Sequence, residues 1–74
     1  MKPAQCRAAR AMLKWRLADL AREAEVNQET VSAFERDVRH PNRNNLRAMR
    51  EAFERHGIVF TFGGGHGVWR ADED

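Results

Sequence analysis

The chain has 74 residues and a formal net charge of +2, and 42% of its residues are hydrophobic. This length suits one small domain and leaves no room for a second core or a deep catalytic cleft. The single cysteine, Cys6, excludes an internal disulfide, and no apolar run approaches the roughly 20 residues that span a membrane. Because no apolar leader follows Met1, we expect a cytoplasmic protein without membrane contact.

Charge is spread unevenly along the chain. Residues 1–56 carry 12 Lys and Arg against 8 Asp and Glu, whereas residues 57–74 carry 1 Arg against 3 acids. A modest basic excess favours a nucleic-acid partner, but solvated helix faces explain it equally well. Charge alone therefore does not choose a function.

The first half of the chain predicts three helices. Pro3 suits the first turn of a helix, and the good helix formers that follow continue it to Leu13. An apolar pattern restarts at Leu17, which predicts a second, short helix. Asn27 can cap a third helix that ends near Arg36, since its side chain accepts from nearby backbone amides.

A fourth helix is expected after a loop. Pro41 favours the loop, and Asn42, or less favourably Asn44, can cap the helix that follows. Gly57 ends this helix. Its expected inner face carries Leu46, Met49 and Phe53.

The last part of the chain predicts a β-hairpin. Residues 58–62 are all β-branched or aromatic, and residues 68–70 resemble them weakly. The glycine-rich run 63–67 between them can turn back. A short acidic tail follows at residues 71–74.

Residues 17–36 match two short helices that cross closely around a shared core. The crossing needs a small residue, and Ala21 stands there. The positions expected to face the core are all apolar: Leu20, Ala24, Val26, Val31 and Phe34. This spacing predicts a helix-turn-helix, whose second helix presents polar residues to the major groove of DNA.

The residues in this window also form two recognisable runs. Residues 20–27 read Leu-Ala-Arg-Glu-Ala-Glu-Val-Asn, and residues 30–35 read Thr-Val-Ser-Ala-Phe-Glu. With Ala8, Ala9, Arg10, Trp15 and Pro41 around them, they resemble the Cro/repressor family of helix-turn-helix regulators, also called the XRE family, over about residues 5–56. Residues 3–10 and the hairpin resemble a branch of very short bacterial regulators. The resemblance implies a mainly α fold, with a four-helix lambda-repressor-like DNA-binding domain at residues 1–56.

The resemblance also implies which residues meet DNA. The third helix enters the major groove, where glutamine can read adenine, glutamate can accept from the amino group of cytosine, and a methyl group can touch thymine. The implied base-reading residues are Gln28, Glu29, Ser32 and Ala33. The residues implied to hold DNA phosphates are Arg16, Thr30, Arg36, Arg39, Asn42, Arg43 and Asn44.

The chain departs from the family pattern at the turn and at the start of the second helix. Glu25 stands where the family usually has glycine, so we expect it to adopt a positive φ at some energetic cost. Arg16 and Leu17 replace a Ser or Thr followed by a phosphate-anchoring Gln, so a charge takes the place of a hydrogen bond. The family also implies a structural ion pair between Arg10 and Glu35.

The hairpin predicts how two copies assemble. An isolated two-stranded hairpin is marginal in water, so its phenylalanine face should pack on the fourth helix. Its edge stays uncovered, and an uncovered edge strand pairs readily with its copy. We therefore expect residues 57–74 to form a two-fold homodimer; the alternative is a monomer whose hairpin only closes the core. The expected dimerisation residues are Ile58, Val59, Phe60, Phe62 and Trp69.

These observations predict a sequence-specific transcriptional regulator, a repressor or an activator, that binds a pseudo-palindromic operator in the nucleoid as a dimer. The alternative is a helix-turn-helix that serves as a protein-interaction module, such as an antitoxin or an anti-activator; Leu17 and Glu29 leave this open. His40, His56 and His66 lack the paired spacing of a zinc site, and the glycine run lacks the residues of a phosphate loop. We therefore expect no enzyme activity, metal, cofactor or small-molecule ligand.

Overall fold

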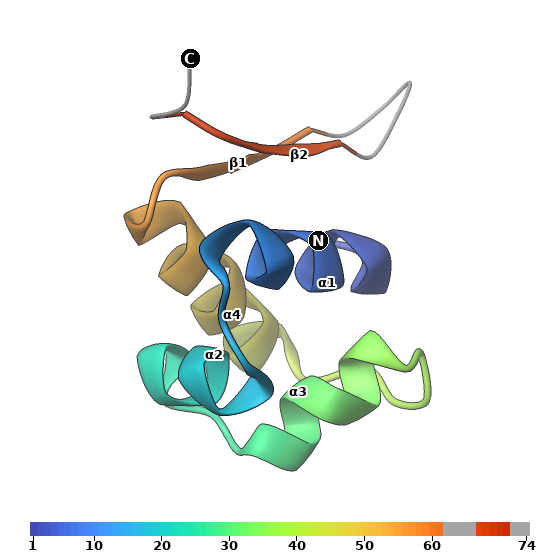
Figure 1. Cartoon of the computed structure of the whole chain (residues 1–74). Helices are drawn as coiled ribbons and strands as arrows, with labels where there is room; N and C mark the ends of the chain where they lie inside the picture. Colours follow the sequence, from blue (N-terminus) through green and yellow to red (C-terminus); the bar gives the residue numbers. More distant parts are fainter. Residues whose placement is uncertain (62–66, 72–74) are drawn as a thin grey trace.

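The computed structural model describes residues 1–61 and 67–71. In these ranges four helices are followed by two short strands (Figure 1), which confirms the predicted mainly α architecture with a C-terminal hairpin. Their bounds are α1 Pro3–Leu13, α2 Leu17–Ala24, α3 Gln28–Glu35, α4 Arg43–Arg55, β1 Ile58–Phe60 and β2 Val68–Arg70. None of these helices is long and apolar enough to cross a membrane. Residues 62–66, which include Phe62 and most of the predicted glycine-rich turn, and residues 72–74 of the acidic segment lie outside the described residues.

Asparagine side chains start α3 and α4 by binding backbone amides that a helix leaves free. Asn27 Oδ1 accepts from the amide of Glu29 at 2.8 Å. Asn42 Oδ1 accepts from the amide of Asn45 at 2.7 Å. Asn42, and not Asn44, is therefore the cap of α4, and Asn44 lies inside the helix.

The turn between α2 and α3 depends on a left-handed residue. Glu25 has φ 57° and ψ 43°, which confirms the positive φ expected there. This conformation costs roughly 1–2 kcal/mol in a residue with a Cβ. Lys14 and Asp37 adopt similar φ values after α1 and α3, whereas α4 is followed by Gly57 at φ 87°. Only the last of these helix ends therefore has the residue that suits the conformation best.

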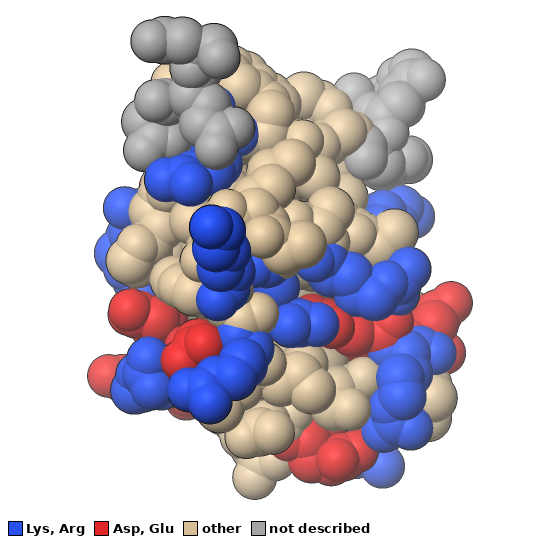
Figure 2. Space-filling view, viewed as in Figure 1, with Lys and Arg blue, Asp and Glu red and all other residues tan. Residues whose placement is uncertain are grey.

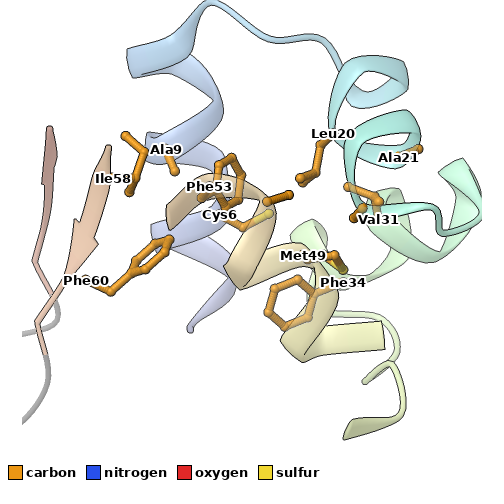
Figure 3. Packing of buried hydrophobic residues seen from close by; sticks show 12 residues of the cluster. Cys6, Ala9, Leu20, Ala21, Val31, Phe34, Met49, Phe53, Ile58 and Phe60 are labelled. Carbon is orange, nitrogen blue, oxygen red and sulfur yellow. The ribbon is translucent and has the colours of Figure 1, made fainter. Parts of the chain in front are cut away.

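The core lies where the four helices meet, and the hairpin closes it on one side (Figure 3). Its largest helical side chains are each at most 1% exposed: Leu20, Val31, Phe34, Met49 and Phe53. Ala21 is buried as the close crossing of α2 and α3 requires, and Val26 is half-buried against the core. Burying each large side chain contributes about 1.5–3 kcal/mol, so this cluster carries most of the stability of a small domain.

The hairpin packs on the helices and exposes its other face. β1 lies against α4 and β2 against α1, so the hairpin covers one end of the helical part (Figure 1). Ile58 and Phe60 are 2% and 9% exposed, and the Phe60 ring centroid lies 5.9 Å from that of Phe53. Both side chains belong to the core of their own protomer, so the expectation that they form dimer contacts is wrong. Val59 is paired with Trp69 across the strands, on the opposite face.

Gln5 connects α1 to the hairpin at the residues that follow β1 and precede β2. Its side chain is buried, and Nε2 donates to the carbonyls of Gly67 at 2.9 Å and Thr61 at 3.2 Å. Its Oε1 accepts from the amide of Lys2 at 2.7 Å. A buried polar bridge therefore connects the first helix to the last element of the chain.

Candidate nucleic-acid interface

One face of α3 is turned to solvent. Gln28 and Glu29 are exposed, Ser32 is half-buried, and Arg36, directly after the helix, is exposed. At about 100° per residue these four positions share one arc of the helix, opposite the side that enters the core. We call them the exposed arc of α3.

Ala33 does not belong to the exposed arc. It is 3% exposed, and the amides of Val38 and Arg39 donate to its carbonyl at 2.9 and 3.3 Å. The loop after α3 therefore folds back on the last turn of the helix. The prediction that the Ala33 methyl group faces base edges is wrong, because its position lies at the margin of the arc and its side chain is buried.

Arg36 links the residues of the exposed arc. Its NH2 lies 2.9 Å from Glu29 Oε1, and its Nε donates to Ser32 Oγ at 3.3 Å. Both members of the ion pair are more than half exposed, with 57% and 68% of the side chains accessible. Such a surface pair is worth at most about 1 kcal/mol and opens easily when a partner arrives. The family resemblance implied a phosphate contact for Arg36 and did not indicate this link, although positions 29, 32 and 36 share a face.

The start of α2 is organised by Asp19. The amide of Arg16 donates to Asp19 Oδ2 at 2.7 Å, and this hydrogen bond lowers the pKa of the Asp19 carboxyl. The Arg16 side chain is 84% exposed and its Nε lies 3.5 Å from the same carboxylate. Leu17 packs, half-buried, against the core. This end of α2 therefore offers an exposed positive charge and no side-chain hydrogen bond from position 17.

The other residues expected to hold phosphates surround the start of α4. Arg39, Asn42, Arg43 and Asn44 are exposed, whereas Thr30 on α3 is half-buried. α4 has 13 residues, and its first amides point away from the helix, which favours anions at this end. Figure 2 shows Lys and Arg mixed with Asp and Glu over the lower, helical half of this view, and a mostly uncharged surface in its upper centre. Contacts with an anion on this side would therefore be local, without one continuous basic surface.

A partly buried ion pair fixes α3 against α1. Arg10 donates from Nε and NH2 to the two carboxylate oxygens of Glu35, at 2.6 and 2.7 Å. Glu35 is 5% exposed, and the hydrogen bond to it raises the pKa of the Arg10 guanidinium. The structure therefore contains the ion pair that the family resemblance implied. Arg10 also donates to the carbonyl of Trp15 at 2.9 Å, which connects the pair to the loop before α2.

Two more side chains of α1 bind Glu35. The Cys6 thiol donates to Glu35 Oε2 at 3.2 Å, and the Arg7 guanidinium donates to the Glu35 carbonyl. Burial raises the pKa of the Cys6 thiol, so it serves as a neutral donor. No local pattern indicated these contacts, because the partners are 29 and 28 residues apart in the chain. Three side chains of α1 thus hold the C-terminal end of α3, and the exposed arc is fixed relative to α1.

A short helix with an exposed polar arc, joined to a second helix by a tight left-handed turn, defines a helix-turn-helix DNA-binding domain. The helix-turn-helix family model matches residues 7–57. This match covers more than half of the chain, so the protein belongs to the Cro/repressor (XRE) type of helix-turn-helix family, which is a DNA-binding regulatory family and not a family of enzymes. No curated protein matches the chain.

Proposed function

We propose that this protein is a sequence-specific transcriptional regulator that reads the major groove with Gln28, Glu29 and Ser32 of α3. The main support is the exposed arc of α3, a helix that the ion pair between Glu35 and Arg10 holds against α1. The major groove admits an α-helix and presents a distinct pattern of donors and acceptors for each base pair. Base reading requires side chains on a rigid element, and the buried ion pair supplies this rigidity.

The chemistry of the arc suits mixed base pairs. Gln28 can make a bidentate pair with adenine, and Ser32 can donate to or accept from any base. Glu29 can accept from the amino group of cytosine. Arg36 binds Oε1 of Glu29, which neutralises the carboxylate near the DNA phosphates and leaves Oε2 to accept.

Around this arc, polar and basic side chains would fix the register of the protein on the duplex without reading sequence. The residues proposed to hold phosphates are Arg16, Thr30, Arg36, Arg39, Asn42, Arg43 and Asn44. The exposed start of α4 adds its free amides to this set.

The finer proposal is a homodimer on a pseudo-palindromic operator, joined through the outer face of the hairpin. One helix-turn-helix reads about one half-site, and two half-sites one DNA turn apart need a two-fold dimer. Trp69 is 50% exposed beside its cross-strand partner Val59. Both strands of the two-stranded sheet are edges, which favours pairing with a second copy.

Binding-site selection from random duplex DNA, followed by two substitutions, tests the reading of bases. On the selected site Gln28→Ala should cost about 1–3 kcal/mol and relax specificity at one base pair. Arg43→Ala should weaken binding to all sequences and reduce the slope of affinity against salt by about one. If both variants lose the same affinity for the selected site as for random DNA, α3 is not the element that reads the sequence.

A second function, protein recognition through the same helices, is favoured by Leu17 in place of a phosphate anchor and by the acidic Glu29 on the arc. Salt separates the two functions. DNA binding weakens steeply as salt rises, because the counterions that the protein displaces from DNA enter a more concentrated solution, whereas binding through apolar area does not weaken in this way. An antitoxin or anti-activator would select no DNA sequence and would hold its protein partner at high salt.

A further inference from the structure

Three arginines of α4 line a pocket beside the proposed DNA contacts. Arg43, Leu46, Arg47 and Arg50 follow one another at steps of three, one and three residues, so they share one face of the helix. Together with Met1 they line a pocket of about 260 Å³. Arg43 and Arg47 are exposed and the Arg50 side chain is 41% exposed, so each keeps access to a ligand from solvent.

The pocket concentrates positive charge, and none of its lining residues is acidic. Glu54 on the same helix forms a loose ion pair with Arg50, 3.7 Å from its Nε, and this buried Nε has no hydrogen-bond partner among the described residues. The acids Glu23, Glu25 and Glu51 line a second pocket on a different face of α4. Arg43 and Arg47 therefore add positive charge to the pocket that Glu54 does not balance, and a bound anion would be attracted to it.

We infer that this pocket binds one phosphate group. Drug-sized ligands occupy pockets of about 300–1,000 Å³, so the smaller volume here suits a phosphate with few attached atoms. Guanidinium groups hold phosphate oxygens through paired hydrogen bonds. Leu46 and Met1 supply an apolar wall for the carbon atoms of a phosphate ester. The phosphate comes either from the DNA backbone, since Arg43 also belongs to the proposed phosphate contacts, or from a free phosphorylated compound.

Titration with inorganic phosphate and with pyrophosphate at constant ionic strength, followed by NMR of the arginine Nε–H signals, tests the free source. We expect saturable binding, weakened about tenfold by Arg47→Gln/Arg50→Gln through loss of charge-assisted hydrogen bonds. Arg47→Gln alone changes an exposed side chain and should weaken binding severalfold, so it serves if the double variant does not fold. Arg22→Gln removes one exposed arginine from α2, outside the pocket, and should bind like the parent protein.

The same variants on the selected duplex test the DNA source. If a DNA phosphate occupies the pocket, Arg47→Gln/Arg50→Gln should flatten the salt slope by about one, while Arg22→Gln leaves it unchanged. Saturable phosphate binding with an unchanged slope assigns the pocket to a free compound. The inference is overturned if Arg47→Gln behaves like Arg22→Gln in both measurements. Because the phosphate titration needs no DNA, it tests phosphate binding by the pocket even if the protein selects no operator.

Discussion

Glu35 is a buried carboxylate whose charge is balanced by one partner, Arg10. The Cys6 thiol adds a neutral hydrogen bond, and Arg7 binds only the backbone carbonyl of the same residue. A buried ion pair adds little net stability over an apolar replacement, but removal of one member leaves an uncompensated charge. The position of α3 relative to α1 therefore depends on both members being present.

Arg10→Met should lower the free energy of unfolding by about 3–5 kcal/mol, because it leaves the Glu35 carboxylate without its partner. Arg10→Met/Glu35→Leu should recover most of this loss, since it removes both charges from the buried site. Urea denaturation of the parent, both single variants and the double variant gives the coupling energy. Purely additive losses would contradict an energetic role for the pair.

Glu25 offers a substitution that should stabilise the protein. Glycine at this position avoids the left-handed penalty of roughly 1–2 kcal/mol but adds about 0.5–1 kcal/mol of unfolded-state entropy. Glu25→Gly should therefore raise the free energy of unfolding by up to about 1 kcal/mol. Glu25→Ala keeps a Cβ and is the matched control, with no gain expected. Thermal denaturation of the two variants decides, and a lower Tm for Glu25→Gly than for Glu25→Ala would refute the strain at this turn.

At the scale of elements, α1 has two separate connections. It holds α3 through Glu35 and it holds the hairpin through Gln5, whose side chain binds two carbonyls and one amide. Different residues of α1 make these two connections, so each connection can be weakened by a substitution that leaves the other in place. The hairpin in turn covers Phe53 of α4 with Phe60.

Gln5→Leu should destabilise the protein by about 1–3 kcal/mol, because the buried Gln5 side chain no longer binds the carbonyls of Thr61 and Gly67. Hydrogen exchange should show where this loss falls. The amide of Thr61, which binds the Gly67 carbonyl at 3.0 Å, should exchange faster, whereas that of Val31 in α3 should keep its protection relative to global unfolding. Lys2→Ala leaves the backbone partner of Gln5 in place and should change neither measurement. Equal acceleration of both amides would argue against a local role for Gln5.

At the scale of the whole molecule, the outer face of the hairpin is the proposed contact between two copies. Trp69→Lys should give a monomer that stays folded, because the side chain is half exposed and a lysine opposes its own copy across the two-fold axis. Its affinity should fall on DNA with two half-sites and remain unchanged on one half-site. Sedimentation at several concentrations measures the assembly.

Ile58→Ala is the matched control for this experiment. It truncates a side chain that is 2% exposed, so it should cost about 2–5 kcal/mol of stability while the outer face stays intact. Deletion of the whole hairpin would remove Ile58 and Phe60 from the core and would not separate assembly from folding. A Trp69→Lys protein that sediments like its parent would exclude this face as the interface.

The fold was predictable because the residues that start and end its helices act on their close neighbours in the chain. Asn27 and Asn42 cap helices within three residues of their own position, and Gly57 ends the last helix where a left-handed residue is needed. The apolar spacing of residues 17–36 placed the core correctly for the same reason, since one helical period determines which side chains meet. The left-handed Glu25 followed from its place in that spacing.

The finer features of the site depend on contacts between distant segments. Ala33 is buried, and its carbonyl binds the amides of Val38 and Arg39 in a loop whose path the helical pattern does not determine. Gln5 meets carbonyls 56 and 62 residues away, and nothing near it in the chain distinguishes it from an exposed glutamine. The sequence allowed Arg36 to bind a phosphate or Glu29. In the protein without DNA, the structure shows it bound to Glu29.

The buried thiol of Cys6 makes the separation of α1 from α3 measurable by chemistry. Its side chain is 0% exposed, and burial raises its pKa, so the closed form offers reagents neither access nor the reactive thiolate. Alkylation must wait until the two helices part, and its rate under native conditions then reports how often they do. Cellular oxidants meet the same obstacle. A sulfenic acid at Cys6 would therefore mark molecules in which α3 had already separated from α1.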